Sequence, residues 1–216
     1  MKILVVSPHP DDETLGAGGT LLKMKKSGHQ IFWLNVTDMK EEDGWGRNTV
    51  SHRQEQIERV KKFYGFYNLS LPPTKLSGIE EGVIITEIRK VLEEVTPEWL
   101  ILPGQYDAHS DHHVVYNCCM ACAKTFRAPY ITRITTMEIL SETEHGFQKE
   151  KFEPNLFIDI TNEMDDKLAA MKIYDTEIEK EPFPRNLEKI KALAIVRGGA
   201  CQSKYAEAFC IVKQIE

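Results

Sequence analysis

The feature that most constrains the fold is a regular alternation of short apolar runs with longer stretches whose apolar residues have helical spacing. Short continuous apolar runs predict buried strands, here at residues 2–6, 31–36, 99–102, 131–139, 157–160 and 209–212. Helices are predicted at residues 14–26, 50–64, 83–95, 112–126, 162–174 and 186–196. Thr161 is the expected cap of the fifth helix. This order predicts an α/β, Rossmann-like fold with a mostly parallel sheet and helices on both faces.

The length of 216 residues, without a repeat or an evident linker, predicts one domain over residues 1–216. The formal charge of −6 argues against nucleic acid as the main ligand. The apolar runs are all shorter than the ~20 residues that a membrane span needs. Five cysteines, an odd number, favour a reduced protein, so we expect a cytoplasmic location. Cys119 and Cys122 are expected to pack as small apolar residues of a buried helix.

A cluster of one imidazole and three carboxylates follows the first predicted strand, in residues 7–13 (SPHPDDE). Ligands of such sheets bind beyond the carboxyl ends of the strands, which is where this segment lies. His9 and Asp12 are three residues apart at the bend into the helix, and imidazole and carboxylate are ordinary zinc ligands. Capping of the helix explains one acidic residue, but not three beside a histidine. The segment therefore indicates a metal or catalytic site.

A second polar cluster, residues 106–113 (YDAHSDHH), follows the strand predicted at residues 99–102. In a parallel sheet it reaches the same edge as the first cluster, so His112 or His113 can complete a three-ligand zinc site. His109 and His113 are four residues apart, which leaves a helical histidine pair as a competing set of ligands.

Together, the motifs at residues 8–13 (PHPDDE) and 109–112 (HSDH) resemble those of the PIG-L/LmbE-like family of zinc-dependent N-acetylglucosamine deacetylases. Weaker likenesses lie at residues 53–55, 159–174 and 197–209, so the resemblance extends along nearly the whole chain.

The resemblance implies a role for each matching residue. His9, Asp12 and His112 are the implied zinc ligands, and Asp11 and His109 are the implied catalytic residues. In that scheme Asp11 is the general base that takes a proton from metal-bound water, so it has to be distinct from the ligands. His109 stabilises the oxyanion or protonates the leaving amine. Asp111 orients a histidine, and Arg53 and Tyr205 bind the substrate or the oxyanion.

The implied reaction is removal of an acetyl group from an N-acetylglucosamine-type sugar, and the native metal and the particular sugar stay open. A site of two histidines and one aspartate also accepts iron, cobalt or nickel. Two departures from the family pattern bear on specificity: Ser110 replaces the usual proline, and residues 38–46 form a longer acidic loop. Trp45 in that loop either stacks on a sugar ring or anchors the loop. The resemblance also makes a homo-oligomer plausible.

Two other functions compete with this interpretation. Residues 16–19 (GAGG) after the first strand, with Asp38 after the second, suggest a dinucleotide-binding oxidoreductase. These glycines lie inside the predicted helix, however, and the carboxylates at its start would repel a pyrophosphate. We therefore expect the glycines to allow close packing of the helix on the sheet. The second alternative is a metal-binding protein of the same fold without catalytic activity.

Overall fold

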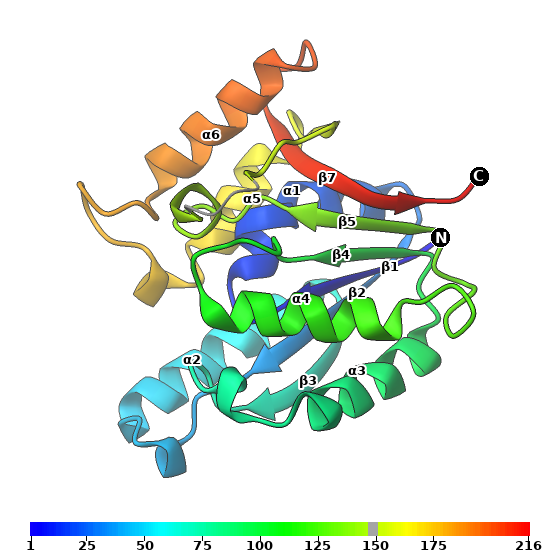
Figure 1. Ribbon diagram of the computed structural model, residues 1–216. Helices are drawn as coiled ribbons and strands as arrows, with labels where there is room; N and C mark the ends of the chain where they lie inside the picture. The colour runs from blue at the N-terminus through cyan, green and yellow to red at the C-terminus, as the bar shows by residue number, and fades with distance from the viewer. Residues whose placement is uncertain (147–150) are drawn as a thin grey trace.

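The computed structural model describes residues 1–146 and 151–216 and contains one seven-stranded sheet (Figure 1). The strands are β1 (Lys2–Ser7), β2 (Gln30–Thr37), β3 (Gly65–Leu71), β4 (Trp99–Leu102), β5 (Arg133–Met137), β6 (Leu156–Asp159) and β7 (Ala206–Gln214). Their order is β3-β2-β1-β4-β5-β7-β6, in which β7 runs antiparallel to both of its neighbours and the other pairs are parallel. The predicted mostly parallel, Rossmann-like sheet is confirmed.

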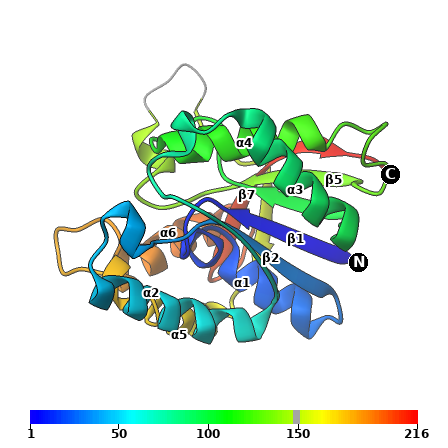
Figure 2. The same ribbon diagram turned by 90° about the horizontal axis from the view of Figure 1, so that it is seen from below.

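Helices cover both faces of the sheet, as Figure 2 shows. The helices are α1 (Asp12–Lys26), α2 (Arg47–Val60), α3 (Glu81–Val95), α4 (Ser110–Cys122), α5 (Met164–Met171) and α6 (Leu187–Gly199). α3 and α4 pack on one face, and the other four helices pack on the opposite face. Ile3 and Val5 of β1 belong to one core and Leu4 and Val6 to the other, because successive side chains of a strand point to opposite faces.

Two local predictions were wrong. Strand β3 lies where we expected no element, because its half-buried edge position gives it no continuous apolar run. The sequence also predicted Thr161 as a cap, but α5 begins at Met164 after Glu163. The Thr161 hydroxyl instead donates to the carboxylate of Asp159 at 2.6 Å, which closes a turn after β6.

The glycines of α1 allow the close helix packing that the sequence predicted. A Cβ atom at Gly16 would lie 2.7 Å from the side chain of Met137, and one at Gly19 would lie 2.7 Å from that of Ile160. Both distances are too short for real Cβ contacts, and Ile160 is fully buried. The two glycines therefore set how closely α1 approaches the sheet.

Replacing Gly19 with alanine is expected to destabilise the protein by about 1–3 kcal/mol, because overpacking a filled core forces side chains off their rotamers. Gly82→Ala in α3 is the matched control, since its Cβ would meet nothing closer than 3.6 Å. The control is expected to be neutral or stabilising by up to about 1 kcal/mol. Urea unfolding measures both changes, and equal effects of the two substitutions would refute the packing role of Gly19.

The cysteines are free thiols, and Cys118, Cys119 and Cys122 are buried on α4. This burial on a helix is what the sequence predicted, and Cys122 also contacts the carbonyl oxygen of Ile85 in α3 at 3.4 Å. In the described parts of the chain, none of the helices combines the length and the apolar character needed to cross a bilayer.

Candidate metal centre

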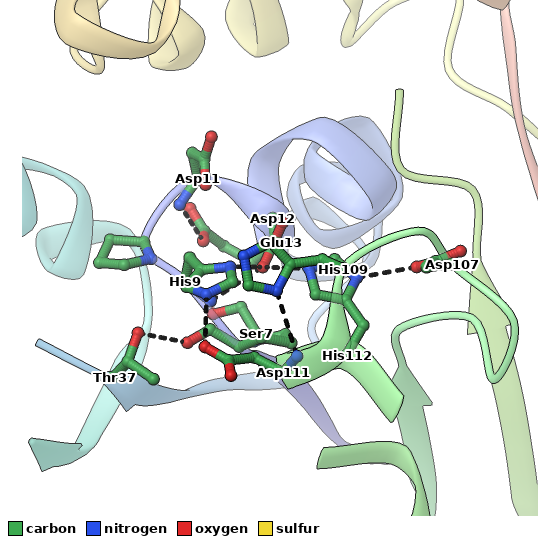
Figure 3. A network of polar contacts seen from close by, with 12 residues as sticks. Ser7, His9, Asp11, Asp12, Glu13, Thr37, Asp107, His109, Asp111 and His112 are labelled. Atoms are coloured by element: carbon green, nitrogen blue, oxygen red, sulfur yellow. Dashed lines mark hydrogen bonds and ion pairs between the residues drawn. The ribbon is translucent and has the colours of Figure 1, made fainter. Parts of the chain in front are cut away.

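Three predicted ligands converge at the carboxyl edge of the sheet, as Figure 3 shows. His9 follows β1, Asp12 begins α1, and His112 lies in the first turn of α4. The Oδ2 atom of Asp12 lies 3.5 Å from Nδ1 of His9 and 3.4 Å from Nε2 of His112. The ligand atoms of the three side chains lie within 4.8 Å of one another, a spacing that suits one ion.

Each histidine of this group is held by a second carboxylate. Asp111 accepts from Nε2 of His9 at 3.1 Å, and Asp107 accepts from Nδ1 of His112 at 2.8 Å. This leaves Nδ1 of His9 and Nε2 of His112 directed at Asp12. Carboxylate support of the outer ring nitrogen is the usual arrangement around a metal-bound histidine. The predicted orienting role of Asp111 therefore has a definite partner, His9.

The side chain of His112 is only 1% exposed. Its Nε2 atom is buried and makes no hydrogen bond within the described residues. A buried ring nitrogen without a partner is costly, so such atoms call for a ligand. The histidine and carboxylate donors around it are the set that zinc prefers. The residues of this group therefore fit a divalent ion.

The electrostatics of the group favour positive charge. Burial alone would lower the pKa of His9, but its hydrogen bonds to Asp111 and Asp12 raise it to about 9. Burial opposes the charge of His112 in the same way, and Asp12 and Asp107 raise the pKa of that imidazole to about 10. Burial would raise the pKa of Asp12, yet the charge of His112 holds it well below its usual range. The carboxylates thus attract a cation to this point.

A second set of possible ligands, His9, His109 and Asp111, lies beside the first. Both carboxylate oxygens of Asp111 in this set already accept hydrogen bonds from backbone N–H groups, from Thr74 at 2.7 Å and from Leu76 at 3.2 Å. We therefore favour the first set. His113 belongs to neither set in the described residues, and its Nε2 contacts the carbonyl oxygen of Asp107. The competing pair of His109 and His113 has no support in the structure.

Asp11 lies beside the ligands but in neither set of them among the described residues. Its backbone has a φ of 136°, a conformation that L-residues rarely adopt and that costs about 1–3 kcal/mol. Burial and the charges of Asp12 and Glu177 raise the pKa of its carboxyl well above the usual value. A free carboxylate with a raised pKa is suited to general-base catalysis near neutral pH.

Three side chains hold Asp11 in this conformation. Glu13 accepts from its backbone N–H at 3.2 Å, Arg53 donates to the preceding carbonyl of Pro10 at 3.1 Å, and Arg185 reaches its carboxylate at 3.3 Å. Arg53 is 5% exposed. The predicted site residue Arg53 therefore supports the segment that carries Asp11.

His109 lies next to the metal group, with its ring centroid 4.4 Å from that of His9. Burial and repulsion by His9 and His112 lower its pKa to about 4, so His109 is neutral at pH 7. Its Nδ1 atom accepts from the backbone N–H of Asp111 at 3.1 Å. The remaining proton of the neutral ring is therefore on Nε2, which makes this nitrogen a hydrogen-bond donor.

These groups line a cleft with a volume of about 170 Å³. The lining residues are His9, Pro10, Asp11, Asp12, Trp45, Arg53, Pro73, Thr74, His109, Glu142, Glu177 and Arg185. Tyr205, which the sequence also predicted as a substrate contact, is not among them. Its side chain is 7% exposed and packs in the core, with Lys191 and Lys204 near the ring.

Sequence reasoning missed two residues of this region. Asp107 holds His112, and its position five residues earlier in the same histidine-rich loop was an available signal. Arg185 contacts Asp11 from the segment between α5 and α6, 174 residues away along the chain. Nothing in the local pattern around Arg185 indicates that contact.

The dinucleotide alternative finds no support in the structure. Asp11, Asp12 and Glu13 are buried at the start of α1, where a pyrophosphate would have to bind. Gly16 and Gly19 lie within the helix and face the side chains of Met137 and Ile160 rather than a ligand cleft.

An α/β sheet with a His-Asp-His group and a free carboxylate at its carboxyl edge is the arrangement expected of a metal-dependent hydrolase. The sequence matches the PIG-L family, described as GlcNAc-PI de-N-acetylase, over residues 4–123. The match covers more than half of the chain, and the chain belongs to this family.

Similar proteins lie mostly among deacetylases. The diacetylchitobiose deacetylase of Thermococcus kodakarensis is 26% identical over 99% of this chain and 84% of its own length. The N,N′-diacetylchitobiose deacetylase of Pyrococcus horikoshii, solved with an inhibitor, superposes with a TM-score of 0.77 at 20% identity, covering 98% of this chain and 84% of its own. A 4-carboxy-2-hydroxymuconate hydratase from Pseudomonas putida KT2440 superposes with a TM-score of 0.75 at 15% identity, covering 100% of this chain and 97% of its own. The fold alone therefore does not decide the reaction.

Proposed function

We propose that this chain is a metal-dependent hydrolase that removes the acetyl group from an N-acetylglucosamine-type amino sugar. One divalent ion, zinc, is held by His9, Asp12 and His112. The observation that carries the proposal is the buried Nε2 atom of His112, which makes no hydrogen bond in the described residues and lies 3.4 Å from Oδ2 of Asp12. The family and the relatives named as deacetylases of diacetylchitobiose support the reaction.

Zinc suits two imidazoles and one carboxylate, and iron, cobalt or nickel can replace it in such a site. When bound, the ion supplies Lewis acidity and lowers the pKa of a coordinated water to about 7. The carboxylates of Asp107 and Asp111 fix the rings of His112 and His9, so that one nitrogen of each ring stays directed at the centre.

In this mechanism Asp11 accepts the proton of the attacking water and later delivers it to the leaving amine. The role requires a carboxylate that is close to the metal and not a ligand, and Asp11 meets both conditions. Arg53 and Arg185 balance its charge and fix its position. The strained backbone of Asp11 fits this role, because strain of this kind clusters at functional sites.

His109 donates from Nε2 to the oxyanion that forms on the acetyl carbonyl. Its Nδ1 atom accepts from the backbone N–H of Asp111, which places the proton of the neutral ring on Nε2. This Nε2 donor supports oxyanion stabilisation, one of the two roles that the resemblance implied for His109. The proton for the amine then comes from Asp11.

The test is acetate release by the zinc-reconstituted protein from N-acetylglucosamine, N,N′-diacetylchitobiose and N-acetylglucosaminyl malate, with N-acetylglutamate as the control without a sugar. We expect release from at least one sugar and none from N-acetylglutamate. A protein that binds metal but releases no acetate from any sugar would contradict the proposal and favour a metal-binding protein without this activity.

Replacing Asp107 with alanine is expected to weaken metal binding by about 10- to 100-fold, because residues that orient a ligand contribute to affinity in this range. Asp43→Ala is the control, since Asp43 pairs with Lys75 outside the metal group. Competition with a chromophoric chelator measures both affinities. An unchanged affinity in Asp107→Ala would mean that His112 does not depend on this carboxylate for binding.

A further inference from the structure

Trp45 differs from the other two tryptophans of this chain. Trp33 and Trp99 are 0% and 1% exposed, and their indole N–H groups donate to Ser7 at 2.5 Å and Thr135 at 3.0 Å. Trp45 is half-buried. In the described residues its N–H has no hydrogen-bond partner and its ring has no aromatic or cationic neighbour. A buried tryptophan usually has its N–H paired, so Trp45 does not look like a core anchor.

The loop of residues 38–46 holds Trp45 at the cleft. At its start, the buried carboxylate of Asp38 accepts from Gln54 at 2.8 Å and from Asn68 at 3.1 Å. Near its end, Asp43 pairs with Lys75 at 3.4 Å. Gly44 has a φ of 95°, which turns the chain just before the tryptophan. The loop is therefore anchored at two points before Trp45, whose own N–H has no hydrogen-bond partner in the described residues.

Trp45 lines the same cleft as the metal group, together with His9, Thr74 and His109. Among the described residues of the cleft lining it is the only tryptophan, tyrosine or phenylalanine. A pyranose ring has one face of C–H groups and a rim of hydroxyls, so it matches an indole that offers an apolar face and a free N–H donor. An N-acetylated amino acid lacks such a ring face.

We propose that Trp45 is the specificity residue of the cleft: its indole stacks on the pyranose ring of the amino sugar, and its N–H donates to a sugar hydroxyl. The inference rests on the proposed function, because it places the sugar whose acetyl group reaches Asp11 and His109. It assigns the selection of a sugar over other N-acetyl compounds to the acidic loop of residues 38–46.

The kinetic test compares Trp45→Ala and Trp45→Phe with the wild type, using N,N′-diacetylchitobiose. Loss of one stacked aromatic should raise KM by about 10- to 100-fold in Trp45→Ala, with kcat within about threefold. Trp45→Phe keeps a ring face and loses only the N–H, so its KM should rise by less than about tenfold. A KM unchanged in Trp45→Ala would overturn the proposal while leaving the deacetylase function standing.

Intrinsic fluorescence gives a second readout that does not depend on turnover. Trp33 and Trp99 are buried in the core, so a sugar in the cleft should change the emission of Trp45 alone. We expect N-acetylglucosamine or N,N′-diacetylchitobiose to shift the emission of the wild type and to leave that of Trp45→Phe unchanged. If neither sugar changes the wild-type emission, or Trp45→Phe gives the same change, the stacking proposal fails, whatever the activity of the protein.

Discussion

Asp11→Asn is expected to lower kcat by about 10²- to 10⁴-fold, the usual contribution of a general base, while the protein still binds one metal ion. Asparagine has nearly the shape of aspartate but cannot accept a proton at neutral pH. The metal should stay because Asp11 belongs to neither group of possible ligands in the described residues. Steady-state acetate release and metal analysis of the same sample test both parts of this expectation.

The matched control is Glu142→Gln, another carboxylate of the cleft lining that belongs to neither group of possible ligands in the described residues. We expect it to lose less than about tenfold in kcat, because it is not placed to take the proton. Turnover of the metal-loaded Asp11→Asn protein within about tenfold of the wild type would remove Asp11 from the mechanism. Loss of metal in that variant would instead show that Asp11 is a ligand.

Lys167→Met is expected to destabilise the protein by about 3–5 kcal/mol, because it leaves the buried carboxylate of Glu207 without its cation. The side chains of Lys167 and Glu207 are 5% and 3% exposed, and their charged atoms lie 2.6 Å apart. Lys167 also donates to the carbonyl oxygen of Leu15 at 2.8 Å, and Glu207 accepts from the backbone of Gly19 at 2.9 Å. The pair thus ties α1 to α5 and β7. The free energy of unfolding in urea measures the loss.

Two further variants separate the buried charge from the contact itself. Asp166→Asn removes an exposed ion pair with Lys26, which also joins α1 to α5, and should leave stability nearly unchanged. Lys167→Met combined with Glu207→Leu should be more stable than Lys167→Met alone, since no unpaired charge stays buried. A loss of unfolding free energy in the double variant equal to the summed losses of Lys167→Met and Glu207→Leu would show that the uncompensated buried charge is not the cause.

The sequence predicted that His9, Asp12 and His112 lie together, because these residues lie next to strong strand signals. His9 and Asp12 follow β1 directly, and His112 lies in the first turn of α4 after β4, so parallel pairing of β1 with β4 brings them together. Pairing of these two strands follows from the alternating pattern.

The residues that the sequence did not predict depend on contacts without a local pattern. Arg185 reaches Asp11 from a turn region whose path is set by packing. Tyr205 is a different case, because the family likeness placed it with the substrate and the structure places it in the core. Strand β3 is an edge strand with mixed polarity, which periodicity does not distinguish from a loop. The single domain over residues 1–216, the cytoplasmic location and the homo-oligomer stay predictions.

The central claim is that one ion in the group of His9, Asp12 and His112 makes this chain an amino-sugar deacetylase. The most direct measurement is the rate of acetate release from N,N′-diacetylchitobiose as zinc is added to the metal-free protein. Our account predicts no release without metal, a rise in proportion to bound zinc up to one equivalent per chain, and no such rise in His112→Ala. Equal release with and without metal, or a wild-type rate in metal-loaded His112→Ala, would contradict it.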